Sequence, residues 1–250
     1  MIIKSLWKAL DVLEYFTSEN PEAGISEISE ALGLNPSNVC DIVKTFERRG
    51  YLQQNEQNKK YHLGFQILQR YYAFDYSDAA GEIIRPHLKT IAKQTGEMVY
   101  YGAAYQDRVI YLDQAVLNVD TFLMKKSAIG STAPLHCTGL GKALLAYQEE
   151  NFIDEIIARG LDKFTDDTIC RGDILRQELA LIRQRGYSVD NMEHEFGVRC
   201  VGMAILDRKD MPLGAISVTG PSLRFDEQKI EQFANILRGH VEEIRSQMFL

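Results

Sequence analysis

The sequence predicts an α+β fold in two domains joined by a helix, and three patterns carry this prediction. Residues 26–50 hold two short helical patterns around a glycine turn. β-prone runs occur in adjacent pairs joined by short polar turns, which is typical of antiparallel hairpins. Helical patterns surround the later hairpins, which favours helices packed on an antiparallel sheet. We therefore expect domains at residues 1–64 and 80–250, with a linker helix at residues 65–79.

The N-terminal domain is organised around residues 26–50. Ser26 is a suitable N-cap for a first helix, which Gly33 ends. Asn35 caps a second helix, Pro36 occupies its first position, where no N–H is needed, and Gly50 follows its end. Two short helices around a tight turn form a helix-turn-helix, although the same pattern also fits the corner of a plain helical bundle.

The second of these helices has two distinct faces. Its apolar residues share one side at helical spacing, and they are Val39, Ile42, Val43 and Phe46. The outer side is short, polar and able to form hydrogen bonds. It holds Ser37, Asp41, Lys44 and Arg48 opposite the apolar residues, with Asn38, Cys40 and Thr45 beside them. In a helix-turn-helix, such a face can enter the major groove of DNA and contact base edges.

A predicted hairpin follows, with strands at Tyr51–Gln54 and Lys60–Leu63. A helix-turn-helix with a hairpin is a winged helix, and the hairpin tip would bring Lys59 and Lys60 to phosphates, where they position the domain without reading sequence. Residues 35–64 carry five Lys and Arg residues against three acids, whereas the whole chain has a net charge of −7. A weakly basic surface therefore coincides with the parts expected to face DNA.

The rest of the N-terminal region is predicted to be mostly helical. A first helix from Ile3 to Thr17 would close a three-helix core, with the inner residues Leu6, Ala9, Leu10, Leu13 and Phe16. Residues 20–24 form the loop that leads out of it. After the hairpin, no helix breaker interrupts the segment that starts at Phe65, which predicts the linker helix. Its large apolar side chains fit either a dimer contact or the core, and they are Phe65, Ile67, Leu68 and Tyr71.

The second domain alternates helices and hairpins. Helices are predicted over residues 86–94, 140–147, 149–159 and 173–185. Asp173 would cap the last of these, and Asp226 would cap a long closing helix. Strands are predicted in two hairpins, at residues 97–105 with 108–115 and at residues 198–206 with 212–219. Antiparallel strands with helices outside them indicate an α+β sandwich with an antiparallel sheet.

The composition excludes several classes of protein. No apolar run reaches the roughly 20 residues of a membrane span, and the segment after Met1 lacks the apolar centre of a signal peptide. We therefore expect a cytoplasmic protein with no membrane contact. The four cysteines are far apart and form no Cys-x-x-Cys pair, which argues against structural zinc and against a disulfide framework. Their thiols are expected to be reduced.

Two short stretches of the second domain are chemically suggestive. Residues 139–142 resemble a phosphate loop only in part, since His136 and Ala143 stand where the nucleotide motif needs Gly and Ser or Thr. We interpret the stretch as a loop before a helix N-terminus, which favours a carboxylate or another anion, or as a turn needed only for close packing. Ser217 and Thr219 share one face of a predicted strand, which indicates either buried partners or a ligand.

The chain resembles the IclR family of bacterial transcriptional regulators along nearly its whole length. The resemblance rests on the motifs KALDVLE (residues 8–14), YHLG (61–64), PLHCTGLGKA (134–143), RGY (185–187), EHEFGVRC (193–200) and ISVTGP (216–221), together with residues 26–50. Family members are dimeric repressors or activators with an N-terminal winged helix and a C-terminal domain that binds a small effector. The resemblance implies an effector pocket built from Gly139, Leu140, Asp190, Cys200, Ser217 and Thr219.

Two positions depart from the family pattern. Asp41 stands where many relatives have an arginine, so the operator sequence cannot be carried over from them. Leu140 stands where some relatives have a smaller residue, which changes the pocket volume and leaves the size of the ligand open.

The sequence thus predicts a DNA-binding repressor of a catabolic operon, controlled by a small carboxylated effector. Its expected partners are double-stranded operator DNA, the effector, and further copies of the chain in a homodimer or a dimer of dimers. The candidate DNA contacts are Ser26, Asn35, Ser37, Asn38, Asp41, Lys44, Thr45, Arg48, Lys59 and Lys60. We expect no cofactor, no metal and no enzyme activity.

Two alternatives remain open at this point. One is a DNA-binding protein whose second domain serves only dimerisation. The other is a thiol hydrolase or a metal site that uses Cys137 or Cys200 with His136 or His194. No motif positions such a nucleophile, and His and Cys residues in a core are much commoner than catalytic ones.

Overall fold

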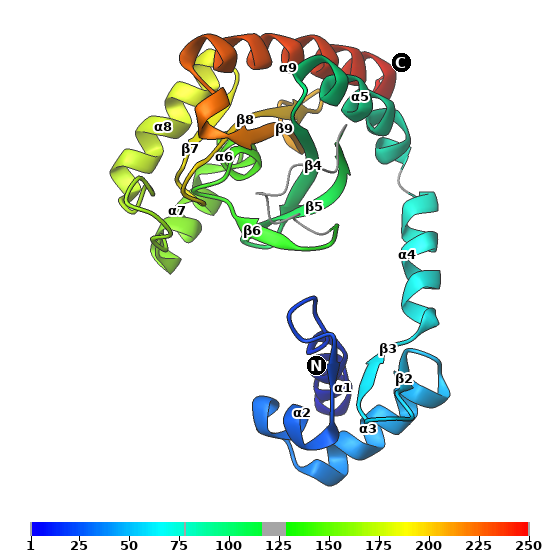
Figure 1. The fold of residues 1–250 in the computed structure, drawn as a ribbon. Coiled ribbons are helices and arrows are strands. Elements are labelled where there is room, and N and C mark those ends of the chain that lie inside the picture. The colour runs from blue at the N-terminus through cyan, green and yellow to red at the C-terminus, as the bar shows by residue number, and fades with distance from the viewer. Residues whose placement is uncertain (1, 78, 117–128, 250) are drawn as a thin grey trace. The chain divides into compact units, whose positions relative to one another are not determined.

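The computed structural model describes residues 2–77, 79–116 and 129–249 of the 250-residue chain (Figure 1). The chain divides into two compact units, Met1–Asp78 and Ala79–Leu250, and each unit is described by itself. Position 78, inside the predicted linker helix, lies outside the described residues. Within those residues, no helix combines the length and the apolar character needed to cross a membrane.

The N-terminal unit is a winged helix-turn-helix. Its helices are α1 (Lys4–Glu14), α2 (Ile25–Leu32), α3 (Pro36–Arg48) and α4 (Phe65–Ser77). Its three strands form an antiparallel sheet in the order β1-β3-β2, and they are β1 (Glu22–Ala23), β2 (Leu52–Gln54) and β3 (Tyr61–Leu63). The core contains the fully buried side chains of Val12, Ile28, Val39, Val43 and Leu52. The helix-turn-helix and the hairpin predicted from the sequence are confirmed.

The turn between α2 and α3 matches the sequence prediction. Gly33 ends α2 in the left-handed conformation, with a φ of 62°, which glycine adopts without a steric penalty. Asn35 then caps α3, since its Oδ1 accepts a hydrogen bond from the Ser37 amide at 2.9 Å, and Pro36 holds the first helical position. These local interactions fix where the polar face of α3 begins.

The start of α2 differs from the prediction. The N-cap is Gly24 and not Ser26, because the helix already begins at Ile25. The Glu27 carboxylate accepts a hydrogen bond from the Gly24 amide at 2.6 Å, and this contact supplies a partner for one of the N–H groups that a helix start leaves free. Ser26 is exposed in the first turn.

The inner face of α1 is narrower than predicted. The helix ends at Glu14 rather than at Thr17. The predicted core residues Leu6 and Leu10 are exposed. Helical periodicity shows which side of a helix is apolar, but it does not show which turns meet a neighbour. The predicted loop at residues 20–24 also contains β1, whose two residues pair with β3.

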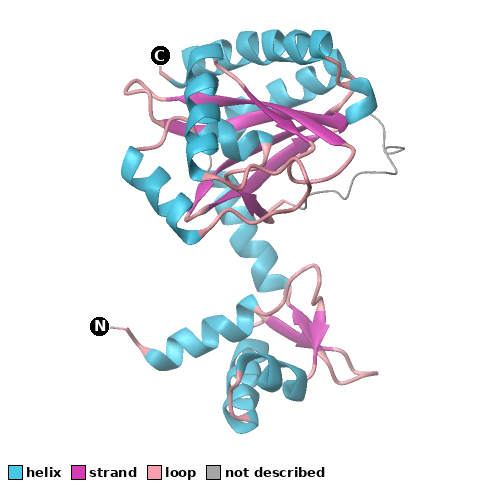
Figure 2. Ribbon diagram, turned by 90° about the vertical axis from the view of Figure 1, so that its left-hand side faces the viewer, coloured by secondary structure: helices cyan, strands magenta, loops and turns pink. Residues whose placement is uncertain are grey.

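The C-terminal unit is built on a six-stranded antiparallel sheet in the order β6-β5-β4-β9-β8-β7. Figure 2 draws its strands in magenta. The strands are β4 (Met98–Tyr105), β5 (Arg108–Ala115), β6 (Thr132–Pro134), β7 (Ser188–Asn191), β8 (Val198–Leu206) and β9 (Pro212–Pro221). The two predicted hairpins are β4-β5 and β8-β9, and they join through β4 and β9. The sequence did not predict β6 and β7, because strands of three and four residues are too short to show a readable alternation.

Helices cover both faces of this sheet (Figure 1). One face carries α5 (Ala79–Thr95) and α9 (Glu227–Met248), and the other carries α6 (Gly139–Leu145), α7 (Glu150–Arg159) and α8 (Gly172–Arg185). Each layer encloses its own apolar core. A short 3-10 helix at Ser222–Arg224 precedes α9, which begins at its predicted N-cap, Asp226.

Two helix starts on this sheet differ from the prediction. α5 begins at Ala79 and not at residue 86, so Pro86 lies inside the helix. α8 begins at Gly172, and Asp173 does not cap it. The Asp173 carboxylate instead forms an ion pair with the guanidinium of Arg171 at 2.6 Å.

The first turn of α6 rests directly on β8. A methyl group on Gly202 would lie 2.3 Å from the carbonyl oxygen of Gly139, and one on Gly139 would lie 2.8 Å from Cys200 Cβ. The Ser188 hydroxyl donates a hydrogen bond to the same Gly139 carbonyl at 2.5 Å. The two glycines therefore allow helix and strand to approach more closely than any other residue pair would.

Replacement of Gly202 by alanine tests this contact. We expect Gly202→Ala to destabilise the C-terminal unit by about 1–3 kcal/mol, because the added methyl group has no space. Urea unfolding of the full chain, followed by circular dichroism, measures the change. The control is Gly239→Ala in α9, where a Cβ would meet no atom within 4 Å and alanine should stabilise the helix by about 0.5–1 kcal/mol. Equal midpoints for the two variants would contradict the close contact.

Candidate functional site

A cavity of about 50 Å³ lies between the start of α6 and the sheet. All six residues of the effector pocket expected from the sequence line it, and they are Gly139, Leu140, Asp190, Cys200, Ser217 and Thr219. Its other lining residues are Tyr100, Tyr111, Thr138, His194, Glu195 and Val198. The structure thus brings together residues that are far apart in the chain.

The register of the sheet explains this convergence. Asp190 of β7 lies opposite Cys200 of β8, which lies opposite Thr219 of β9. In the next row, Ser217 lies opposite Tyr100 of β4. Side chains two residues apart on a strand point to the same face, and directly opposite side chains are close neighbours. Four adjacent strands therefore present one polar floor to α6.

Asp190 is the most unusual ionisable group in the cavity. One carboxyl oxygen accepts a hydrogen bond from the Glu193 amide at 2.8 Å, and the Cys200 thiol points to the other at 3.7 Å. Burial, helped by the nearby charge of Glu193, raises the pKa of Asp190 to about 7, although the charge of Lys142 acts in the opposite direction. Near neutral pH this carboxyl group can therefore donate a hydrogen bond as well as accept one.

Lys142, the cation of the stretch at residues 139–142, is buried in the core and paired there with acidic side chains. Only 1% of its surface is exposed. Its ammonium group forms an ion pair with Glu193 and lies 3.8 Å from Glu178. Burial raises the pKa of Glu193, and the neighbouring Lys142 cation opposes that shift. Lys142 does not line the cavity, so its role here is to hold α6 to the segment after β7.

The effector pocket expected from the sequence contains only half of the residues that line the cavity. Tyr100 and Tyr111 come from β4 and β5, and only the strand register reveals that they face Ser217 and its neighbours. Thr138 was readable in principle, because it directly precedes a helix. Its hydroxyl caps α6 by accepting a hydrogen bond from the Gly141 amide at 3.0 Å.

The thiols are not arranged as nucleophiles. Cys137 and Cys200 are buried, and burial raises the pKa of both thiols well above the usual range. A high pKa leaves the unreactive thiol form in place. His136 Nε2 pairs with the Asp162 carbonyl at 3.0 Å. The histidine is thus engaged with the backbone, and this geometry does not favour the thiol hydrolase alternative.

The DNA-facing candidates lie on the surface of the N-terminal unit. The polar face of α3 is exposed at all six predicted positions, which are Ser37, Asn38, Asp41, Lys44, Thr45 and Arg48. The Asn35 side chain is engaged in the helix cap, and the Thr45 hydroxyl donates to the Asp41 carbonyl at 2.7 Å. The Lys60 ammonium pairs with Glu27 of α2 at 2.8 Å. Lys59 is exposed.

Comparison with known protein families covers both units of the chain. The family model described as "IclR helix-turn-helix domain" matches residues 5–56, and the model described as "Bacterial transcriptional regulator IclR C-terminal" matches residues 80–246. The chain belongs to the IclR family. It is therefore a transcriptional regulator of the IclR type with a DNA-binding helix-turn-helix, and the recognition made from its motifs is confirmed.

Named relatives agree with this assignment. The chain is 29% identical to the transcriptional repressor IclR of Escherichia coli, over 97% of this chain and 89% of that protein. It is 28% identical to the acetate operon repressor of Salmonella typhimurium, over the same shares of the two chains. An IclR homologue from Microbacterium hydrocarbonoxydans, solved in complex with 4-hydroxybenzoate, shares the fold with a TM-score of 0.84 at 20% identity, over 97% of this chain and 98% of that one.

The burial of the thiols yields a direct test. Iodoacetamide at pH 7.5 should modify the exposed Cys170 first and should leave Cys137 and Cys200 unmodified in the folded protein, because both are buried with raised pKa values. Peptide mass spectrometry over time measures the order, and the urea-unfolded chain serves as the control in which all thiols react. Fast modification of Cys200 would contradict this prediction and would support the thiol hydrolase alternative.

Proposed function

We propose that this regulator represses a catabolic operon and is controlled by a small carboxylated metabolite that binds in the cavity between α6 and the sheet. The observation that carries the proposal is the meeting of six expected residues, from β7, β8, β9 and the start of α6, around one cavity. Support also comes from the acetate operon repressor to which the chain is similar.

The chemistry of the lining favours a single carboxylate. Among the described residues that line the cavity there is no lysine or arginine. Within this part of the lining, a ligand's negative charge would meet neutral donors, which the hydroxyls of Ser217 and Thr219, the backbone at Gly139 and a protonated Asp190 supply. The 4-hydroxybenzoate carried by the structural neighbour is one such carboxylate.

The cavity also limits the size of the ligand. A site for one water needs about 10–15 Å³, so a cavity of about 50 Å³ accepts only a few non-hydrogen atoms without expanding. Leu140 occupies part of the space at the start of α6. A two- to three-carbon acid would fit directly, whereas an aromatic acid requires Leu140 or its helix to move.

On the DNA side, we propose that the exposed face of α3 reads the major groove, and that Lys59 and Lys60 on the wing contact phosphates. In this arrangement Asn38 can form a paired contact to adenine, and Asp41 can accept from the cytosine amino group. A single winged helix with a weak positive charge provides little affinity. A homodimer or dimer of dimers on a partly palindromic operator would multiply it.

The pH dependence of ligand binding tests the role of Asp190. A carboxylate should bind best below pH 7 and lose up to about tenfold in affinity per pH unit above it, because an ionised Asp190 repels the ligand and must take up a proton on binding. Calorimetry between pH 6 and 8.5, with the best acid from a thermal-shift panel that includes 4-hydroxybenzoate, measures this. Asp190→Asn should remove the pH dependence, and Asp210→Asn, in the exposed β8-β9 turn, should retain it.

Two further variants test the location of the ligand. Ser217→Ala with Thr219→Val removes two hydroxyls from the floor of the cavity and should weaken binding at least tenfold at pH 6. Affinity equal to that of the wild type would place the ligand elsewhere. Binding without any change in operator affinity would leave the second domain with dimerisation as its only role, since linked sites must affect each other equally.

The DNA proposal predicts two different kinds of loss. Asn38→Ala should cost about 1–3 kcal/mol at one base pair and relax the preference there, whereas Lys59→Ala should weaken all sequences alike and reduce the salt slope by about one. A randomised-operator selection and salt titrations measure the two effects. Asn151→Ala, an exposed asparagine of α7, is the matched control. An unchanged preference in Asn38→Ala would exclude the base contact.

A further inference from the structure

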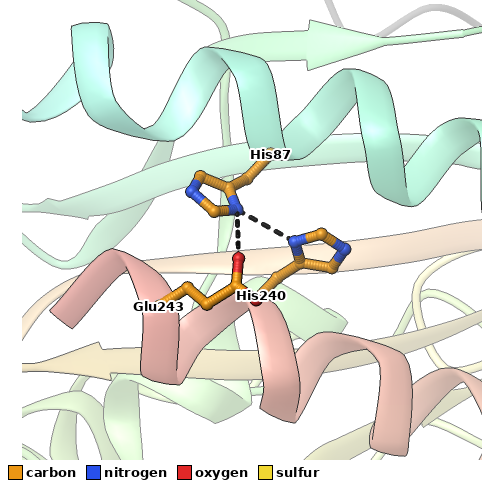
Figure 3. A group of neighbouring side chains, drawn as sticks. All are labelled: His87, His240 and Glu243. Atoms are coloured by element: carbon orange, nitrogen blue, oxygen red, sulfur yellow. Dashed lines mark hydrogen bonds and ion pairs between the residues drawn. The ribbon is translucent and has the colours of Figure 1, made fainter. Parts of the chain in front are cut away.

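Two histidines and a glutamate converge on the outer helical layer of the C-terminal unit, on the face of the sheet opposite the cavity. His87 comes from α5, and His240 and Glu243 come from α9, where the three-residue spacing places them on one side of the helix. Figure 3 shows the three side chains pointing toward one another across the contact between the two helices.

The distances between their ligand atoms suit one small cation. His87 Nδ1 lies 2.9 Å from His240 Nδ1 and 3.8 Å from a carboxylate oxygen of Glu243. One ligand atom from each of the three residues lies within 4.8 Å of the other two. Two donors on a tetrahedral Zn²⁺, each about 2.1 Å from the ion, lie about 3.4 Å apart. The two measured distances bracket that value, so shifts of about half an ångström would complete the geometry.

A second set of contacts orients the imidazole rings. His240 Nε2 lies 3.2 Å from Gln94 Oε1, so that nitrogen carries its proton and leaves the Nδ1 lone pair directed at His87. On the other ring, the side-chain amide of Gln247 lies 3.4 Å from His87 Nε2. In metal sites, the ring nitrogen remote from the ion is commonly held in this way, which fixes the tautomer of the ligand.

We propose that His87, His240 and Glu243 bind one divalent first-row transition-metal ion such as Zn²⁺, and that the ion holds α5 against α9. The ion takes the place of the proton shared between the two Nδ1 atoms, and that proton moves by way of solvent to His87 Nε2, so both ligands remain neutral imidazoles. The Gln247 amide turns over, so that its oxygen accepts from His87 Nε2–H. Imidazole nitrogens with a carboxylate select Zn²⁺ and its neighbours rather than Mg²⁺ or Ca²⁺, which prefer oxygen ligands only.

The site is open to solvent on one side. The Glu243 side chain is 67% exposed, whereas His87 is buried. His240 and Glu243 also line an open surface groove together with Gln94, Asn235 and Gly239. An ion can therefore enter from this groove, and a fourth coordination position faces it, where water or an acidic side chain of another molecule completes the tetrahedron.

Metal titration of the full chain, after treatment with a chelator and its removal, tests the proposal. Cobalt(II) should bind in a 1:1 ratio and give the visible spectrum of a nitrogen and oxygen site, without the sulfur charge-transfer band that the cysteines would produce. Zinc should displace it and raise the melting temperature, since the ion binds only the folded chain. Glu243→Gln, at an exposed position that leaves the fold intact, should weaken binding at least tenfold, and His240→Ala should abolish it.

The matched control is Glu242→Gln, the neighbouring exposed acid on α9, which should bind like the wild type. The absence of binding at a tenfold excess of zinc would overturn the proposal and leave a hydrogen-bonded histidine pair in its place. Wild-type affinity in both Glu243→Gln and His240→Ala would overturn it equally, because the ion would then be held elsewhere on the chain.

Discussion

The approach of α6 to β8 is the contact on which the C-terminal unit depends. It exists because Gly139 and Gly202 leave no side chain between the helix and the strand. The Ser188 hydroxyl also donates a hydrogen bond to the Gly139 carbonyl. Because α6 lies this close to the sheet, its first turn covers the polar face that four neighbouring strands form. A larger residue at either glycine would lift the helix, and Ser217 and Thr219 would then face an open gap in place of an enclosed cavity.

The same helix also decides how charge is distributed in the interior. Two carboxyl groups three residues apart, Asp190 and Glu193, are buried near the ammonium group of Lys142. Glu193 holds that cation, and Asp190 receives a backbone amide and a thiol instead. A weaker partner cannot offset the loss of hydration, so burial raises the pKa of Asp190 to about 7. Burial also raises the pKa of Glu193, and the Lys142 cation opposes that shift.

Features that depend on residues close together in the sequence were predicted correctly, whereas features that depend on contacts between distant residues were not. The bounds of β5 and β8 and the caps Asn35 and Asp226 match the structure, because each depends on residues within a few positions. The start of α2 and the exposure of Leu6 were wrong, since they depend on which groups the fold brings nearby. In the cavity, small and polar residues on motifs could be named from the sequence, whereas Tyr100 could not, because its neighbours are set by strand register. The metal ligands on α5 and α9 were invisible for the same reason.

The order of strands in the sheet has a consequence for synthesis. β4 is synthesised before β9, with which it pairs, and α5 is synthesised before α9, against which it packs. The C-terminal unit can therefore close only after β9 and α9 have been synthesised. The contacts of the N-terminal unit are short in sequence, so this unit can fold while the rest is still being made. A nascent chain would acquire its DNA-binding fold first, and the half-built sheet would meanwhile expose β4 and β5 as an unpaired apolar surface that chaperones can recognise.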